Sequence, residues 1–459
     1  MYIFFVLKNS HDIIKIGVNM DNIKKRIDLN KVELISMLVI IAILTIVSVG
    51  SILVVYKYLK LKEYSYFLIA ITPIELLLYL INKIKKPTLN IKEILVFLLF
   101  IFTTLSLIGS NSIQTSIWGF MNRYEGLLVC YSYYSTALLA STIKDEYYKK
   151  MIIGFIIAIG LVNIIYGLLQ TNIIPLNIKV QDSWKYARGF QGNSMFFASL
   201  MSICYFFIIG IILNSEKNFD WRLAILLLIF TIGNVISGSM ALFCTTIFMF
   251  ILLIIKELIQ IKFKNFSKIR FIKIIICILL YIIINIYGIN RIENYKHDVK
   301  DLSNEITSIT TTKKIENNYG TGRVYIWKEV LKKSKENLIF GVGVDNLYNS
   351  FNPSLIDPAS GYAVDKAHND YLQRLLCEGI FSFICYISLL IIIILQNYKS
   401  NDKIKNILFL GFFAYITQIF FSISVIRVTP IFWIILGLLM FEEEKKKRGR
   451  PKKIKWNGW

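Results

Sequence analysis

The chain has 459 residues, 55% of them apolar, with a mean hydropathy of +0.57 and a net charge of +22. These values exclude an ordinary soluble enzyme, because apolar stretches such as 151–170 and 271–290 are long enough to cross a bilayer. The positive charge falls mostly in segments on one side of the predicted spans, so we interpret it as an orientation signal and expect no nucleic-acid partner.

The N-terminal segment, residues 1–34, is predicted to be cytoplasmic and uncleaved, because no small-residue cleavage site follows an apolar run. Lys57, Lys60 and Lys62 fall on the outer side of the membrane in this arrangement, which leaves the pairing of the first two spans open. Residues 35–290 are predicted to hold nine transmembrane helices, near 35–56, 66–82, 93–110, 126–141, 151–170, 194–213, 223–237, 240–255 and 271–290.

Two short outer segments within this part combine arginine with glycine. Arg123 precedes Gly126 before the fourth span, and Arg188 precedes Gly189 before the sixth. A guanidinium beside glycine permits close approach of a phosphate group and bidentate hydrogen bonding. We therefore predict both arginines to bind pyrophosphate, the alternative being ordinary surface arginines.

Two positions place charge inside predicted spans. Glu75 lies within the second span, where an ionised carboxylate costs roughly 2.5–3.5 kcal/mol, so it should face protein or a cavity. It is interpreted either as a paired structural carboxylate or as a pathway residue. Arg374 and Glu378, four residues apart in the tenth span, are expected to satisfy each other.

Residues 291–370 are predicted to form one large, partly helical extracytoplasmic loop. Its periodicity predicts a helix from Arg323 to Glu336, with Val324, Trp327, Val330 and Leu331 on the face that rests on the bundle. Arg323 follows two glycines and is the third candidate for pyrophosphate binding. The three arginines are predicted to line one electropositive pocket.

The candidate catalytic residue is His368. It precedes Asn369 and Asp370, either of which is a suitable N-cap for the tenth span, so the imidazole should lie at a helix N-terminus that favours nearby anions. The alternative is a packing role. His11 and His297 lie in polar, charged surroundings and are interpreted as solvated.

The remaining sequence predicts three spans within 371–441, near 371–396, 406–424 and 429–441, and a basic cytoplasmic tail at 442–459 that contacts anionic lipid. The fold class is therefore an all-α integral membrane protein with about 12 transmembrane helices. The sequence contains no Walker loop, HExxH or Cys-x-x-Cys motif, so neither a metal site nor a cofactor is predicted. An outward-facing site lacks cytosolic nucleotides, which favours a lipid-linked donor.

Several motifs, in this order, resemble the O-antigen ligase and polymerase superfamily. Its signature is similar to Gly322-Arg323-x3-Trp327, Gly341-Val342-Gly343 and His368-Asn369-x-Tyr371-Leu372, and upstream segments resemble those around Arg123 and Arg188. The resemblance runs from about residue 118 to 438. One departure is Met240, which follows Ser237-Gly238-Ser239 where many relatives have arginine.

The resemblance implies a glycosyltransferase of the lipid-donor (GT-C) type in the bacterial cytoplasmic membrane, with both termini cytoplasmic. It implies metal-independent transfer from an undecaprenyl-pyrophosphate-linked glycan to a glycan, lipid or protein acceptor, with inversion. His368 would then be the base and Arg323, with Arg188 and Arg123, would bind the pyrophosphate. Asn369 and Trp327, within the same motifs, complete the predicted substrate-binding set.

Three alternatives stay open at this point. A flippase or transporter for lipid-linked oligosaccharides suits twelve spans equally well, although no internal repeat is visible. An envelope scaffold without activity would explain Met240. Ligase and polymerase differ in the acceptor, which the sequence does not identify.

Overall fold

The structure is a computed structural model of the chain. It describes residues 28–84, 87–171, 186–217, 220–262, 266–313, 315–351, 354–358 and 360–441, and the backbone of 2–9 and 12–19. The basic tail at 442–459, His11, and residues 184–185 of the Arg188 segment lie outside the described residues.

Two strands stand apart from the predicted all-α class. β1 (Tyr2–Asn9) and β2 (Asp12–Asn19) form an antiparallel hairpin in which Tyr2 lies opposite Asn19. The other named elements are helices, with one isolated bridge between Ile356 and Ala363. The all-helical expectation therefore holds for the body of the protein and is wrong within the N-terminal segment.

Among the described residues, nine helices are long and apolar enough to cross a membrane, and three apolar helices are shorter. The predicted spans all fall on these helices, whereas the number that cross the membrane stays a prediction. The nine are α2 (Leu29–Val55), α3 (Leu61–Lys83), α4 with η1 (Ile91–Gly109), α7 (Glu146–Gln170), α8 (Ser194–Asn214), α10 (Met240–Lys262), α11 (Lys268–Arg291), α15 (Asp370–Asn397) and α16 with η3 (Lys403–Phe421). The shorter three are α6 (Leu127–Ala140), α9 (Trp221–Ile236) and α17 (Thr429–Met440).

The centre of the bundle is formed by α17, in which every residue is buried, together with α6 and α8. Outer helices keep one apolar face exposed, as at Leu80 and Ile283, each about three-fifths exposed (59% and 60%). Such faces fit lipid, which solvates apolar side chains. Glu75 is fully buried and accepts hydrogen bonds from the hydroxyls of Ser135 and Thr136 in α6, so it faces protein as predicted.

α2 and α3 pack against each other and are joined by a short turn that contains Lys57 and Lys60. Lys57 adopts a left-handed conformation there (φ 61°), which closes the reversal between the two helices. The first two predicted spans therefore form a helical hairpin, as the predicted arrangement assumes.

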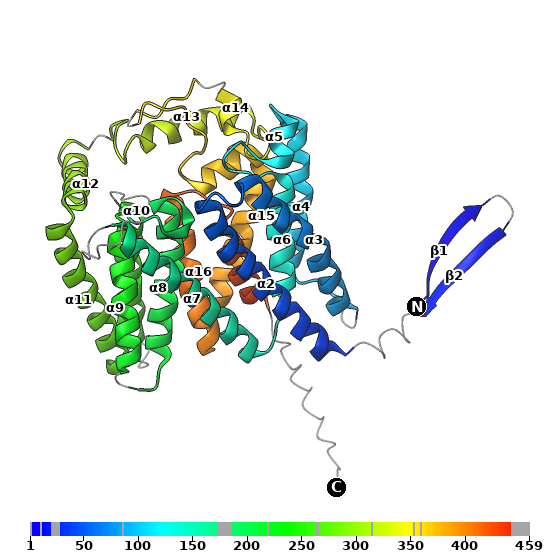
Figure 1. Cartoon of the computed structure of the whole chain (residues 1–459), viewed down its shortest axis with the longest axis horizontal. Coiled ribbons are helices and arrows are strands. Elements are labelled where there is room, and N and C mark those ends of the chain that lie inside the picture. Colours follow the sequence, from blue (N-terminus) through cyan, green and yellow to red (C-terminus); the bar gives the residue numbers. More distant parts are fainter. Residues whose placement is uncertain are drawn as a thin grey trace, which may run out of the picture.

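The large polar segment lies over one end of the helical bundle (Figure 1) and is partly helical. It contains α12 (Glu293–Thr312), α13 (Arg323–Glu336) and α14 (Leu347–Phe351). The predicted bounds of α13 are confirmed. The segment has a small apolar core of its own, made by Ile326, Val330, Val342, Leu347, Leu355, Val364, Ala367, Leu376 and Cys377.

The predicted buried face of α13 is wrong in part. Ile326, Val330 and Ser334 are buried, whereas Leu331 is 42% exposed. These three lie at i, i+4 and i+8, so the contact stripe follows the 3.6-residue period through Ile326 instead of Leu331. The helix therefore packs on α15 and on its own loop core.

α15 is broken at Gly379, where φ is 78° and the backbone is not helical. The break leaves backbone N–H and C=O groups of α15 without helical partners, and the segment that follows α13 binds two of them. Val342 N–H donates to Leu376 O (2.9 Å), and Ile380 N–H donates to Leu338 O (2.8 Å). A side chain at Gly379 would collide with the Ile339 carbonyl. Only glycine fits this conformation and this close approach.

Candidate active site

His368 sits at the junction between the polar segment and α15, in a left-handed conformation (φ 50°). Both of its neighbours are fixed by hydrogen bonds. Trp327 Nε1–H donates to Ala367 O (3.0 Å), and Ala367 N–H donates to Gln373 Oε1 (2.8 Å). Asn369 caps α15, since its Oδ1 accepts from Leu372 N–H (3.0 Å). The backbone on both sides of His368 is thus held by α13 and α15 together.

The surroundings of His368 favour the neutral imidazole. Burial lowers its pKa to about 4, with the positive charges of Arg323 and Arg123 acting in the same direction and Asp365 and Asp357 opposing them. Its Nδ1 is buried and has no hydrogen-bond partner within the described ranges. At neutral pH the ring is therefore uncharged and has a nitrogen free to accept a proton, as a general base requires.

Arg323, the first residue of α13, reaches from the polar segment into the bundle. Its Nη1–H donates to Phe421 O (2.9 Å), and its Nη2 lies 3.6 Å from Met195 Sδ. Burial lowers its pKa, but a guanidinium stays charged at neutral pH. Within the described residues no carboxylate lies within 4.0 Å of it, and the negative charge of Asp357 acts on it only from a greater distance.

Arg123 is paired instead. Its Nε and Nη2 donate to the two carboxylate oxygens of Asp365 at 2.7 and 3.1 Å, and its guanidinium lies 5.7 Å from the Phe196 ring centroid. Burial lowers the pKa of Arg123, and the hydrogen bonds and charge of Asp365 more than offset this. The fork of Arg123 is therefore already occupied on one side, which leaves Nη1 for another ligand.

Arg188 lies at a tight turn just before η2 (Gly189–Gln191). The side-chain Oε1 of Gln170 in α7 accepts from the backbone N–H groups of Arg188 and Gly189, both at 2.9 Å. This anchors the turn between α7 and α8. The structure brings Arg323 and Arg123 into electrostatic range of His368, and the part of Arg188 in substrate binding stays a prediction.

A cavity of about 110 Å³ adjoins Arg123. Its wall includes Arg427, from the segment between η3 (Ile419–Phe421) and α17, whose Nη1–H donates to Phe190 O (3.3 Å). The other lining residues are Leu61, Asn122, Arg123, Glu125, Gln191, Gly192, Phe196, Val425 and Ile426. Sequence analysis missed Arg427 because no motif or glycine distinguishes it.

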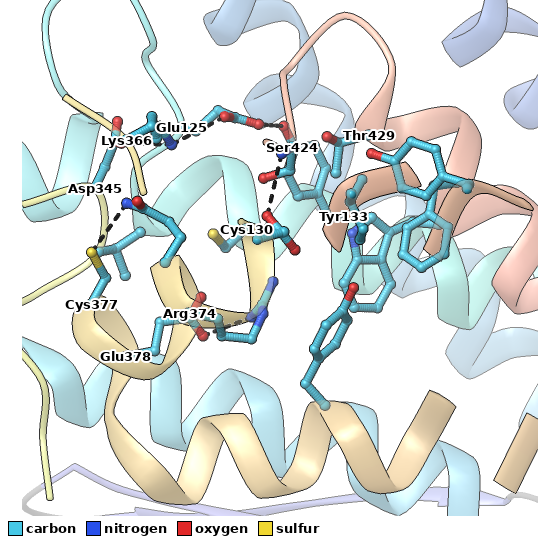
Figure 2. A pocket seen from close by; sticks show the side chains of 18 residues that line it. Glu125, Cys130, Tyr133, Asp345, Lys366, Arg374, Cys377, Glu378, Ser424 and Thr429 are labelled. Carbon is cyan, nitrogen blue, oxygen red and sulfur yellow. Dashed lines mark hydrogen bonds and ion pairs between the residues drawn. The ribbon is translucent and has the colours of Figure 1, made fainter. Parts of the chain in front are cut away.

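A second feature absent from the predictions is a buried ion network centred on Lys366. Its Nζ lies 2.8 Å from Asp345 Oδ1 and 3.4 Å from Glu125 Oε2, and Figure 2 shows the amine between the two carboxylates. Tyr133 O–H donates to Glu125 (2.9 Å) and Phe120 N–H donates to Asp345 (2.7 Å). Burial alone would lower the pKa of Lys366, but the two carboxylates raise it well above its ordinary value.

This network lines a smaller cavity of about 40 Å³ together with residues of α15, α6 and α17. In α15, Arg374 Nη1 lies 2.7 Å from Glu378 Oε2, as the i, i+4 spacing predicts (Figure 2). Asp370 Oδ1 accepts from Ser424 N–H at 3.3 Å. Lys366 and Asp370, each two residues from His368, line the cavity, and ion pairs form part of its wall.

The predicted roles of Asn369 and Trp327 in substrate binding stay predictions, but both residues have defined structural contacts. Asn369 is 2% exposed and caps α15. Trp327 packs against Phe420 and Phe421, with ring centroids 5.7 and 6.3 Å apart. His297 is paired with Asp301 at 2.9 Å and is 74% exposed, so it lies at the solvent-facing surface as expected.

Met240 is the first residue of α10, after a turn at Gly238. Cys244, one helical turn further, is close enough to Arg323 for an electrostatic interaction. Arg323 thus lies near the position where the resemblance leads one to expect a second arginine. The described residues contain no group of three or more His, Cys, Asp or Glu arranged to hold a metal ion.

Residues 223–387, from α9 into α15, match the family model described as O-antigen ligase. The match covers Arg323, Trp327, His368 and Asn369, and it confirms the predicted resemblance to the O-antigen ligase and polymerase superfamily. It supports a glycan-transfer function in a multi-pass membrane protein. A search of curated proteins gives no match.

Proposed function

We propose that this O-antigen ligase-like protein is a glycosyltransferase that moves a glycan from an undecaprenyl-pyrophosphate donor to an acceptor hydroxyl at the outer face of the bacterial cytoplasmic membrane. The observation that carries the proposal is His368, half-buried with a buried Nδ1 and neutral, within electrostatic range of Arg323, whose charge no carboxylate of the described residues balances at contact distance. A base and an uncompensated cation suit an acceptor hydroxyl and a departing pyrophosphate.

The transfer step follows from these two groups. A ring nitrogen of His368 takes the acceptor's hydroxyl proton while the oxygen attacks the anomeric carbon. The bond between that carbon and the pyrophosphate oxygen breaks, and its electron pair leaves with the lipid pyrophosphate. Arg323 stabilises the developing negative charge through the fork of its guanidinium. Direct attack inverts the anomeric carbon, and these protein groups carry it out without a metal ion.

The low pKa of His368 makes it a weak base in the free protein, because proton affinity falls with pKa. A bound pyrophosphate would add negative charge near Arg323 and offset the repulsion that the arginines exert on imidazolium. The pKa of His368 should therefore rise when the donor binds. Donor binding would then activate the base.

This argument predicts the pH dependence of transfer. In kcat/KM, which reports the free protein, the acidic limb should fall near pH 4, well below the ordinary histidine value of about 6.5. In kcat, which reports the donor complex, the limb should lie at higher pH. Initial rates from about one pH unit below the expected limb up to pH 8 measure both, with protein stability checked at each pH. An acidic limb at the same pH in both profiles would contradict activation by the donor.

Replacement of Arg323 by lysine should lower kcat/KM for the donor by roughly ten- to a hundredfold, the loss of one or two charge-assisted hydrogen bonds. Lysine keeps the charge but loses the planar fork that contacts Phe421. Steady-state rates with purified protein give the value. The matched control is Arg222→Lys. Arg222 is exposed at the start of α9, so this variant should transfer glycan at the wild-type rate. Wild-type kinetics for Arg323→Lys would place Arg323 outside the donor site.

A proteoliposome assay tests the function class. A glycosyltransferase consumes the donor and releases undecaprenyl pyrophosphate, whereas a transporter moves the intact donor between leaflets. Gene deletion followed by sizing of surface glycan then separates the acceptor classes. Loss of long chains with a single repeat still attached indicates a polymerase, and accumulation of long lipid-linked glycan indicates a ligase.

A further inference from the structure

Arg427 and Arg323 join the same two segments of the protein from different directions. Arg323 contacts Phe421 and Met195, while Arg427 lies in the 422–428 segment and contacts Phe190. Arg323 therefore contacts the first turn of α8 and the end of η3, and Arg427 links the segment before α17 to η2, which precedes α8. Arg123 lies against Phe196 in the first turn of α8. Three arginines thus surround residues 190–196.

The arginines in this part of the protein differ in whether a carboxylate lies next to them. Arg123 is paired with Asp365, and Arg374 in α15 is paired with Glu378, each at 2.7 Å. Arg427 donates one hydrogen bond to a carbonyl oxygen, and no carboxylate of the described residues lies within ion-pair distance of it. Arg427 is half-buried, and this burial lowers the pKa of its guanidinium, which has no carboxylate of the described residues at contact distance. A partly desolvated guanidinium without a carboxylate partner is suited to bind an anion.

The cavity beside Arg427 is built for a small polar group. Gly192 has φ 77°, and a side chain there would collide with the Arg427 guanidinium, so the absence of a Cβ keeps this wall open. The buried Oε1 of Gln191 has no hydrogen-bond partner in the described part and is available to a donor such as a hydroxyl. Glu125 also lines the cavity, but Lys366 and Tyr133 already bind its carboxylate oxygens.

We propose that Arg427, assisted by the free edge of Arg123, binds a phosphate group of the lipid-linked donor in this cavity, with Gln191 accepting from a hydroxyl on the same molecule. This deepens the proposed function and rests on it for the identity of the donor. Arg427 lies outside the matched residues 223–387, and the family resemblance, which extends over 422–438, gave it no role. Arg123 lines this cavity, and its charge also acts on the imidazole of His368.

The test uses the full chain in nanodiscs and the variants Arg427→Gln and Arg427→Lys. Inorganic pyrophosphate is the probe, measured by direct binding and by inhibition of transfer. Arg427→Gln should weaken pyrophosphate binding and raise the KM for the donor by roughly ten- to a hundredfold, and Arg427→Lys by less. The control Arg222→Gln removes an exposed arginine and should leave both values unchanged.

Two outcomes would overturn the assignment. One is wild-type pyrophosphate affinity in both Arg427 variants. The other is a loss confined to nanodiscs that contain anionic phospholipid, which would assign Arg427 to a membrane headgroup. Pyrophosphate binding measured in His368→Ala separates this site from the reaction. If the Arg427 variants still weaken pyrophosphate binding but the wild-type protein transfers no glycan, the phosphate site is supported and the proposed function is wrong.

Discussion

Substitution of His368 by alanine is expected to lower kcat for glycan transfer by about a hundred- to ten-thousandfold, the range that a general base contributes. Asp365, whose charge acts on His368, is already bound by the guanidinium of Arg123 and is therefore a poor substitute base. The variant should still insert and bind donor, because Trp327 and Asn369 hold the flanking backbone through Ala367 O and Leu372 N–H.

The left-handed backbone at His368 requires a second variant, because alanine adopts this conformation at a cost of roughly 1–2 kcal/mol. Asparagine tolerates it better, so His368→Asn separates loss of the base from backbone strain. Both variants should be equally inactive, and thermal unfolding should be nearly unchanged in the second. The exposed His297→Ala serves as the control. Transfer within tenfold of wild type in His368→Asn would remove His368 as the base.

Substitution of Lys366 by methionine is expected to cost about 3–5 kcal/mol of unfolding free energy, because it leaves Asp345 and Glu125 buried without a counterion. Thermal unfolding of purified protein and limited proteolysis of the polar segment measure the effect. Glycan transfer should fall with stability, since Lys366 is two residues from His368. Lys333→Met, which removes the partly exposed pair with Glu336, should cost less than about 1 kcal/mol.

A triple variant sharpens this prediction. When Lys366→Met is combined with Asp345→Asn and Glu125→Gln, no unpaired charge is left in the network. Most of the lost stability should then return, because a neutral buried cluster avoids the desolvation cost of ions. Equal stability of Lys366→Met and wild type would show that the carboxylates are solvated or protonated in the protein.

Local features of the site were predictable from sequence. The glycines before Arg323 and the apolar period predicted both end residues of α13. The Asn369-Asp370 pair indicated the N-cap of α15. Both signals lie within a few positions of the element that they define. The pairing of Arg374 with Glu378 follows from helical spacing in the same way.

Long-range partners were not predictable. Arg123 and Asp365 are separated by 242 positions, and Lys366 and Glu125 by 241, so no periodicity links them. The same holds for Arg427. Its proximity to the turn at 190–192, on which the proposed phosphate site depends, is visible only in the folded protein. Glu75 was placed correctly in the interior because the cost of a carboxylate in lipid is large, although Ser135 and Thr136 as its partners were not foreseen.

The break in α15 at Gly379 divides the outer part of the protein into regions that can evolve at different rates. Residues 338–342 complete the hydrogen bonding of the broken turn, so an insertion or deletion there would unravel the start of a membrane helix. α12 instead bonds to Tyr186 and to the Tyr319-Gly320 turn, away from that break. Chimaeras with a related protein should therefore stay folded when they cross over between 313 and 318 and keep 338–380 from a single parent.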